Sequence, residues 1–141
     1  MKKAAVIYWS GTGNTEQMAN AVLEGMKSAG AEAVSLTPSQ VNDGVIDGLE
    51  AIAFGCPSMG AEVLEEEEFE PMFNGIKGKL AGKAVALFGS YGWGDGEWMR
   101  NWEADCKASG ITLANECIIC NEAPEADTVE DLKAMGAKIV Q

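Results

Sequence analysis

The fold of this chain is decided by residues 4–15, Ala4-Ala-Val-Ile-Tyr-Trp-Ser10-Gly-Thr-Gly-Asn-Thr15. The first half is an unbroken apolar and aromatic run, which is typical of a parallel strand buried on both faces. The second half is small and polar, and an amphipathic helical pattern follows it directly. Backbone N–H groups at the N-terminus of such a helix bind anions with the help of the helix dipole, and Gly11 and Gly13 let the backbone approach a ligand closely. We therefore expect a strand, an anion-binding loop and a helix.

The loop at 10–15 lacks the features of two common nucleotide-binding motifs. A Walker A loop requires G-x-x-x-x-G-K-[ST], and a dinucleotide fingerprint requires a third glycine where Glu16 stands. No Lys or Arg lies in the loop, so its donors are neutral and suit a single terminal phosphate. An ordinary strand-to-helix turn with a capped helix is the alternative. The side-chain donors that the loop offers are Ser10, Thr12, Asn14 and Thr15.

The strand and the loop at 10–15 resemble the FMN phosphate loop of flavodoxins, and the later loops extend the resemblance over the whole chain. The resemblance is to the short-chain flavodoxins of anaerobic bacteria. It implies an α/β fold, a doubly wound five-stranded parallel sheet of order 2-1-3-4-5 with helices on both faces, for which flavodoxin is itself a standard example. It also implies noncovalently bound FMN at the switch point of the sheet. We expect residues 1–141 to form one flavodoxin-like domain.

A second loop, Cys56-Pro-Ser-Met-Gly-Ala-Glu62, resembles the flavodoxin loop that covers one face of the flavin ring. The resemblance implies that Met59 packs on the ring, that the Gly60 carbonyl turns toward N5-H on one-electron reduction, and that Glu62 accepts a hydrogen bond from N3-H. Some flavodoxins carry a hydroxyl residue where Pro57 stands. A phosphate contact from this loop is therefore left to Ser58 or to the backbone of Pro57.

The order Gly60-Ala61 bears on the redox behaviour that the resemblance implies. If residues 59–62 form a β-turn, a type II′ turn places the positive φ on Gly60, whereas a type II turn places it on Ala61. This favours type II′ by about 1 kcal/mol, and it would favour the semiquinone by roughly 40 mV for a one-electron couple. A plain glycine turn beside a core methionine is the alternative.

A third loop, residues 89–96, places two aromatic residues among four glycines. Glycines let such rings lie flat against a planar ligand. By resemblance, Trp93 stacks on the outer flavin face, Ser90 reaches the phosphate, and backbone N–H groups near Gly92 serve the pyrimidine oxygen. Tyr91 and Gly96 complete this part of the expected cofactor site.

Alternating strand and helix patterns fill the rest of the chain, which indicates βαβ units and a parallel sheet. A capping box at Thr128-x-x-Asp131 is expected to open the last helix. Asn115 is expected to mark an irregularity in the last strand. The expected elements after the first strand are a helix at 14–29, a strand at 31–36, turns at 37–48, strands at 49–55 and 83–89, helices after 69 and 97, and a strand at 111–120.

Composition excludes several functional classes. The formal net charge of −12 over 141 residues repels nucleic acid and anionic membranes and speeds encounter with basic protein surfaces. Residues 1–3 are not followed by a signal-peptide pattern and no run is long enough to span a membrane, so we expect a cytoplasmic monomer. Cys117 and Cys120 form a C-x-x-C, but positions three apart on a strand face opposite sides, and small hydrophobic side chains are the favoured interpretation over a metal site.

These patterns predict an electron carrier that is not itself an enzyme. The resemblance implies low-potential transfer of single electrons between the semiquinone and hydroquinone of FMN. The acidic residues are expected to flank the flavin, to lower its potential and to attract basic docking surfaces on redox partners; they are residues 65–68, Glu70, Glu122, Glu125 and Asp127. A solvated acidic face is the alternative for those residues. An FMN-dependent NAD(P)H or quinone oxidoreductase is the alternative function. A signalling receiver domain is excluded because Ser10 and Cys56 stand where it needs carboxylates.

Overall fold

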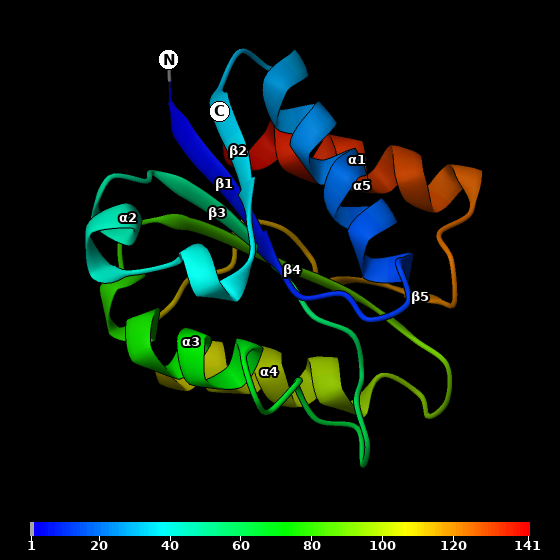
Figure 1. The fold of residues 1–141 in the computed structure, drawn as a ribbon. Helices are drawn as coiled ribbons and strands as arrows, with labels where there is room; N and C mark the ends of the chain where they lie inside the picture. The colour runs from blue at the N-terminus through cyan, green and yellow to red at the C-terminus, as the bar shows by residue number, and fades with distance from the viewer. Residues whose placement is uncertain (1) are drawn as a thin grey trace.

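The computed structural model describes residues 2–141 and consists of one five-stranded parallel sheet between two layers of helices (Figure 1). The strand order is β2-β1-β3-β4-β5, and all four neighbouring pairs are parallel, so the predicted topology is confirmed. β3 is buried at every position, which matches its continuous apolar sequence. The strands are β1 (Lys3–Tyr8), β2 (Glu32–Leu36), β3 (Ala51–Gly55), β4 (Ala84–Tyr91) and β5 (Ile118–Asn121).

Each face of the sheet is covered by its own set of helices, as Figure 1 shows. α1 (Asn14–Ser28) and α5 (Ala126–Ile139) lie side by side on one face. The other face carries α3 (Phe69–Ile76), α4 (Glu97–Ala108) and the short α2 (Asp43–Asp47). Two 3-10 turns, η1 (Pro38–Gln40) and η2 (Lys77–Lys79), complete the described elements. No helix of residues 2–141 has the length and apolar character that a membrane crossing requires.

Two hydrophobic cores hold these layers together. The core under α1 and α5 contains Met18, Val22 and Leu132, and the core under α3 and α4 contains aromatic residues such as Phe73 and Trp102. In the second core the rings of Phe73 and Trp102 meet edge to face, with their centroids 5.6 Å apart. The helices therefore bury their apolar faces against the sheet.

The fifth strand is shorter than predicted. β5 begins at Ile118, and upstream of it only an isolated bridge between Leu113 and Val85 joins the chain to β4. From that bridge to the pair of Ile118 with Phe88, β4 advances three residues while its partner advances five. The extra residues bulge out of the ladder around Asn115, where the sequence predicted an irregularity.

The predicted capping box at Thr128 is wrong. α5 begins at Ala126 with Glu125 at its N-cap, and no side chain caps it. The backbone N–H of Val129 donates to the Glu125 carbonyl at 2.9 Å, which closes the first helical turn before Thr128 could act as the cap. Thr128 thus lies inside the first turn instead of preceding it.

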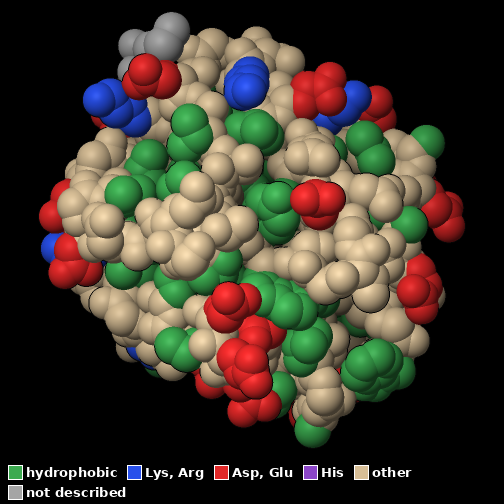
Figure 2. Space-filling model, in the orientation of Figure 1, with side chains coloured by type: hydrophobic (Ala, Val, Ile, Leu, Met, Phe, Trp, Pro, Cys, Tyr) green, Lys and Arg blue, Asp and Glu red, His purple; other side chains and the backbone are tan. Residues whose placement is uncertain are grey.

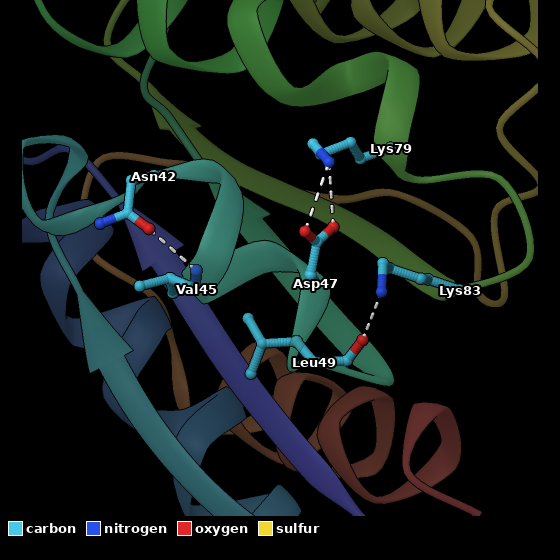
Figure 3. A network of polar contacts seen from close by, with 6 residues as sticks. All are labelled: Asn42, Val45, Asp47, Leu49, Lys79 and Lys83. Atoms are coloured by element: carbon cyan, nitrogen blue, oxygen red, sulfur yellow. Dashed lines mark hydrogen bonds and ion pairs between the residues drawn. The ribbon is translucent and has the colours of Figure 1, made fainter.

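Polar contacts fix the segment between β2 and β3 at the amino edge of the sheet, the edge where the parallel strands begin (Figure 3). Asn42 caps α2 by accepting from the Val45 N–H at 2.9 Å. Asp47 pairs with Lys79 at 3.1 Å, and Lys83 donates to the Leu49 carbonyl at 2.7 Å. These contacts connect α2 to η2, and they connect Leu49, which precedes β3, to Lys83, the residue before β4.

Candidate functional site

The loops that follow β1, β3 and β4 meet at the carboxyl edge of the sheet, where the parallel strands end. The hydroxyls of Thr15 and Ser90 lie 3.2 Å apart and both residues are buried. The Ser58 N–H donates to the Ser90 carbonyl at 3.0 Å. Three segments far apart in the sequence are thereby held together, as expected for an open parallel sheet at its switch point.

Between these loops lies a cavity of about 360 Å³, here called the slot. Its lining combines aromatic rings, hydroxyl groups and glycine backbone, and it includes neither Lys nor Arg. Trp9 lines it without having been predicted near the cofactor, and Glu122, which was expected to flank the flavin, lines it as well. The predicted residues that line it are Gly11, Thr12, Asn14, Thr15, Pro57, Ser58, Met59, Ser90, Tyr91, Gly92 and Trp93.

One end of the slot offers backbone donors at the N-terminus of α1. Gly13 occupies the N-cap position with φ 99°, and it has no side chain to satisfy the helix N–H groups. The hydroxyl of Ser10 accepts from the N–H groups of Gly13 and Glu16, at 3.1 and 3.3 Å. Among residues 2–141 there is no acceptor for the N–H groups of Asn14 and Thr15. The unsatisfied N–H groups at this end of the slot can therefore donate hydrogen bonds to an anion.

A second unsatisfied group lies in the same slot. Ser58 is only 5% exposed, and its hydroxyl has no hydrogen-bond partner within residues 2–141. A buried polar group without a partner costs about 1–3 kcal/mol, so proteins rarely retain one without a ligand or water to satisfy it. Together with the open N–H groups and the aromatic rings, this hydroxyl fits a flat aromatic ligand that carries a phosphate.

At the opposite end, the loop after β3 differs from the β-turn expected at 59–62. Met59 and Val63 exchange two backbone hydrogen bonds of 2.9 and 3.0 Å, so the loop between them contains three residues. The positive φ expected at Gly60 is present, at 48°. Glu62 also has a positive φ, 56°. It is the last residue of the loop, the position at which three-residue hairpin loops commonly have a left-handed residue.

Several predicted site residues lie outside the slot lining. Gly60 is exposed, and its carbonyl accepts from the indole N–H of Trp93 at 3.1 Å. The carboxylate of Glu62 turns to the N-terminus of α4 and accepts from the Glu97 N–H at 2.8 Å. Gly96 is the N-cap of α4. The others that do not line the slot are Ser10, Gly13 and Ala61.

Sequence reasoning assigned Trp9 to the first strand and missed its place in the slot. Its indole N–H donates to the Glu68 carboxylate at 2.8 Å, so Trp9 joins the phosphate-loop end of the slot to the acidic run. An aromatic residue directly before a glycine-rich loop at a strand end was the available signal. Glu122 has φ 60°, and its N–H donates to the Tyr91 carbonyl at 2.8 Å, which brings it to the slot.

The acidic run at 65–68 is not simply a solvated face. Glu65 is 5% exposed and caps α3, because its carboxylate accepts from the N–H groups of Glu67, Glu68 and Phe69 at 2.7 to 2.9 Å. Burial by itself raises the pKa of the Glu65 carboxyl, but the three N–H donors outweigh it and the net pKa is lowered. Glu66 and Glu67 remain exposed.

A family model described as flavodoxin matches residues 6–135. The chain belongs to the flavodoxin family. A flavodoxin from Clostridium beijerinckii is 44% identical over 135 residues, which cover 95% of this chain and 96% of that one. A flavodoxin from Megasphaera elsdenii is 44% identical over 131 residues, 93% of each chain. The solution structure of two-electron-reduced M. elsdenii flavodoxin has a TM-score of 0.87 at 43% identity and covers 96% of this chain and 98% of that one.

The predicted family, fold and cofactor are thereby confirmed. Flavodoxins are electron carriers that bind FMN, and the function of this flavodoxin is electron transfer on bound FMN. The loops at the two ends of the slot supply what such a cofactor needs, namely donors for one phosphate and aromatic surface for a ring.

The cysteines of this flavodoxin do not form a second site. Cys117 packs against the core under α3 and α4, and Cys120 packs against the core under α1 and α5, so the two face opposite sides of the sheet as predicted. Burial raises the pKa of Cys117 to about 12 and that of Cys120 to about 11. Among residues 2–141, no group of three or more acidic, His or Cys residues could hold a metal ion.

Proposed function

We propose that the slot holds FMN with its phosphate at the N-terminus of α1 and its ring at the loops after β3 and β4. One observation carries this assignment: the slot combines unsatisfied hydrogen-bond donors with aromatic side chains. The donors are the N–H groups of Asn14 and Thr15 and the hydroxyl of Ser58. Hydroxyls of Thr12 and Ser90 add donors to the phosphate. Met59 and Trp93 are the candidates to cover the two faces of the ring.

The surroundings of the slot support a low reduction potential. Bound FMN supplies the one-electron redox chemistry. The chain provides no Lys or Arg in the slot lining to neutralise the phosphate or an added electron, and the carboxylate of Glu122 lies in that lining. Negative charge near the site disfavours further negative charge, so the protein residues make the fully reduced state a strong reductant.

A carrier fits the slot better than an enzyme. Trp93 is 56% exposed at the mouth of the slot, which leaves an aromatic edge open to a partner protein. If Met59 and Trp93 cover both ring faces, no face is left for a nicotinamide or quinone to dock. The chain contains no histidine, and burial raises the pKa values of its cysteine thiols. The thiol that donates to a carboxylate, Cys117 to Glu103 at 3.2 Å, does not line the slot, so among residues 2–141 the slot offers no activated nucleophile.

The rim of the slot suits a basic partner. Asp95, on the loop after β4, and Glu122, on the loop after β5, are exposed, and the guanidinium of Arg100 is already paired with Asp95 at 2.9 Å. Figure 2 shows one face of the molecule with acidic side chains spread over it, including a group low on that face, while most of the visible Lys and Arg side chains lie near the upper margin. Such a charge distribution steers a basic protein surface to the slot, and the encounter weakens with salt. We place this encounter in the cytoplasm, with the flavodoxin as a monomer.

The test is a titration of the purified apoprotein with FMN, followed by stepwise reduction of the complex. We expect one FMN bound per chain with quenching of flavin fluorescence, two separate one-electron steps on reduction, and no steady-state oxidation of NAD(P)H by the pure protein. Failure to bind FMN would overturn the slot assignment. Turnover of NAD(P)H would establish the oxidoreductase alternative instead.

A further inference from the structure

Two hydrogen bonds join the loop at 59–63 to the segment at 92–97. The Trp93 indole N–H donates to the Gly60 carbonyl at 3.1 Å, and the Glu97 backbone N–H donates to the Glu62 carboxylate at 2.8 Å. We call this pair of bonds the clasp. It connects residues more than thirty positions apart in the sequence, and it joins the loop after β3 to the loop after β4 through Trp93 and to the start of α4 through Glu97.

The Glu62 carboxylate acts as a cap for α4 from a distant part of the chain. α4 begins after Gly96, which has φ 96° and no side chain to satisfy the first N–H groups of the helix. A negative charge at this end is stabilised by the helix dipole. The carboxylate of Glu62 takes the place that Ser, Thr, Asn or Asp usually fills at an N-cap.

Gly94 makes room for this cap. A Cβ added at Gly94 would overlap the Glu62 carboxylate, so the carboxylate rests directly on the Gly94 backbone. Glu62 itself has φ 56°, a conformation that is costly for a residue with a side chain and that persists only where its surroundings fix it. The hydrogen bond from the Glu97 N–H to the Glu62 carboxylate helps to hold Glu62 in this conformation.

We propose that Gly94 and the Glu97 N–H are positioning groups, which hold Glu62 and the Gly60 carbonyl in place before the cofactor arrives. The inference rests on the proposed FMN slot. Because a preformed loop does not have to be ordered on binding, the clasp contributes to FMN affinity although neither Gly94 nor Glu97 lines the slot. Opening the clasp is expected to weaken FMN binding about two- to thirtyfold, the range that corresponds to losing one helix cap.

A matched pair of glycine variants tests this directly. Gly94→Ala introduces a Cβ into the place of the Glu62 carboxylate, whereas Gly82→Ala has nearly the same φ, 84° against 82°, and open space around its added Cβ. Both variants carry the same left-handed strain, but only Gly94→Ala displaces Glu62. We expect both to lower the melting temperature of the apoprotein, and only Gly94→Ala to raise the dissociation constant for FMN and to speed hydrogen exchange at the Glu97 amide.

Substitutions at Glu62 give a second readout in case Gly94→Ala does not fold. Glu62→Gln keeps an acceptor oxygen and is expected to retain most of the protection of the Glu97 amide, while Glu62→Ala is expected to lose it. In the Glu62→Ala background, Gly94→Ala is expected to weaken FMN binding no more than Gly82→Ala does.

The inference is overturned if Gly94→Ala and Gly82→Ala have the same FMN affinity and the same Glu97 exchange rate. It is also overturned if Gly94→Ala tightens FMN binding, because Glu62 would then have to leave α4 for the cofactor to bind. Either result leaves the slot assignment intact. Absence of FMN binding by the wild-type chain would instead remove the slot assignment.

Discussion

At the amino edge of the sheet polar groups satisfy one another, whereas at the carboxyl edge several are left open. Asp47 pairs with Lys79 and Lys83 donates to the Leu49 carbonyl at the first edge (Figure 3). At the second edge the Thr15 N–H and the Ser58 hydroxyl have no partner within residues 2–141. The polar groups at the amino edge therefore stabilise the fold, whereas unsatisfied groups at the carboxyl edge remain available to a ligand. Such a difference is expected where function and stability compete.

Among substitutions at the two edges, we expect the largest loss of FMN affinity at Thr15, which lies at the carboxyl edge. Thr15→Val keeps the shape of a fully buried side chain but removes its hydroxyl, which lies 3.2 Å from that of Ser90. Loss of a hydrogen bond to a charged phosphate costs about 1.5–3 kcal/mol, so we expect FMN to bind roughly tenfold to over a hundredfold more weakly. A fluorescence titration with FMN measures this, with the exposed Thr112→Val as control. Equal affinities for the two variants would place the phosphate elsewhere.

Glu65 is the exception at the carboxyl edge, because its buried carboxylate is fully satisfied. We expect Glu65→Gln to lower the unfolding free energy by about 2 kcal/mol at neutral pH, since hydrogen bonds to a charged acceptor are lost. The pKa of Glu65 is lowered in the folded state, so this stabilisation is present above the unfolded carboxyl pKa of about 4.3 and is lost as the pH falls through the folded value.

Chemical denaturation of the wild type and of Glu65→Gln across this pH range tests the cap at α3. The difference in unfolding free energy should stay constant above about pH 5.5 and shrink at lower pH. Glu66→Gln serves as control, because Glu66 is exposed. A difference between wild type and Glu65→Gln that does not change with pH would contradict the cap.

The Ser58 hydroxyl should show opposite effects on stability and binding. Ser58→Ala removes a buried hydroxyl that has no partner, so the apoprotein is expected to gain about 1 kcal/mol of stability. FMN binding is expected to weaken, because a donor in the slot is lost. Thermal unfolding without and with FMN measures both changes. A variant that is less stable as apoprotein would mean that the hydroxyl is already satisfied.

The smallest expected effect lies at the amino edge. Lys79→Ala removes an ion pair with Asp47 whose two side chains are well exposed, 37% and 60%, and exposed pairs contribute only about 0.2–1 kcal/mol. FMN affinity should not change. Urea denaturation and an FMN titration check the two statements, and a loss of affinity here would show that the two edges are coupled.

The sequence predicted those parts of the molecule that depend on local patterns. Strand and helix order followed from the hydrophobic period, and the meeting of three loops followed from the geometry of parallel sheets. The positive φ at Gly60 also followed, because it depends on two neighbouring residues. Each of these features follows from a short local pattern or from the general geometry of parallel sheets.

Features that depend on contacts between distant segments were missed. Glu62 as the cap of α4 and Trp9 as a slot residue bonded to Glu68 involve partners 35 and 59 positions away. The five-residue span of Met59–Val63 was missed because a backbone bridge, and not the residue types at 60 and 61, sets the length of the loop. The bulge before β5 was located by Asn115 but its extent was not, since the pairing with β4 decides the register.

The central claim is that the three loops at the carboxyl edge form one slot for FMN. The most direct measurement is an FMN titration of isotopically labelled apoprotein followed by amide and indole N–H resonances. We predict saturable shifts for the Asn14, Thr15 and Ser58 amides and the Trp9 and Trp93 indoles, with no shift for Val45 or Lys83 at the amino edge. Saturable shifts at the amino edge, or none among the three loops, would contradict the claim.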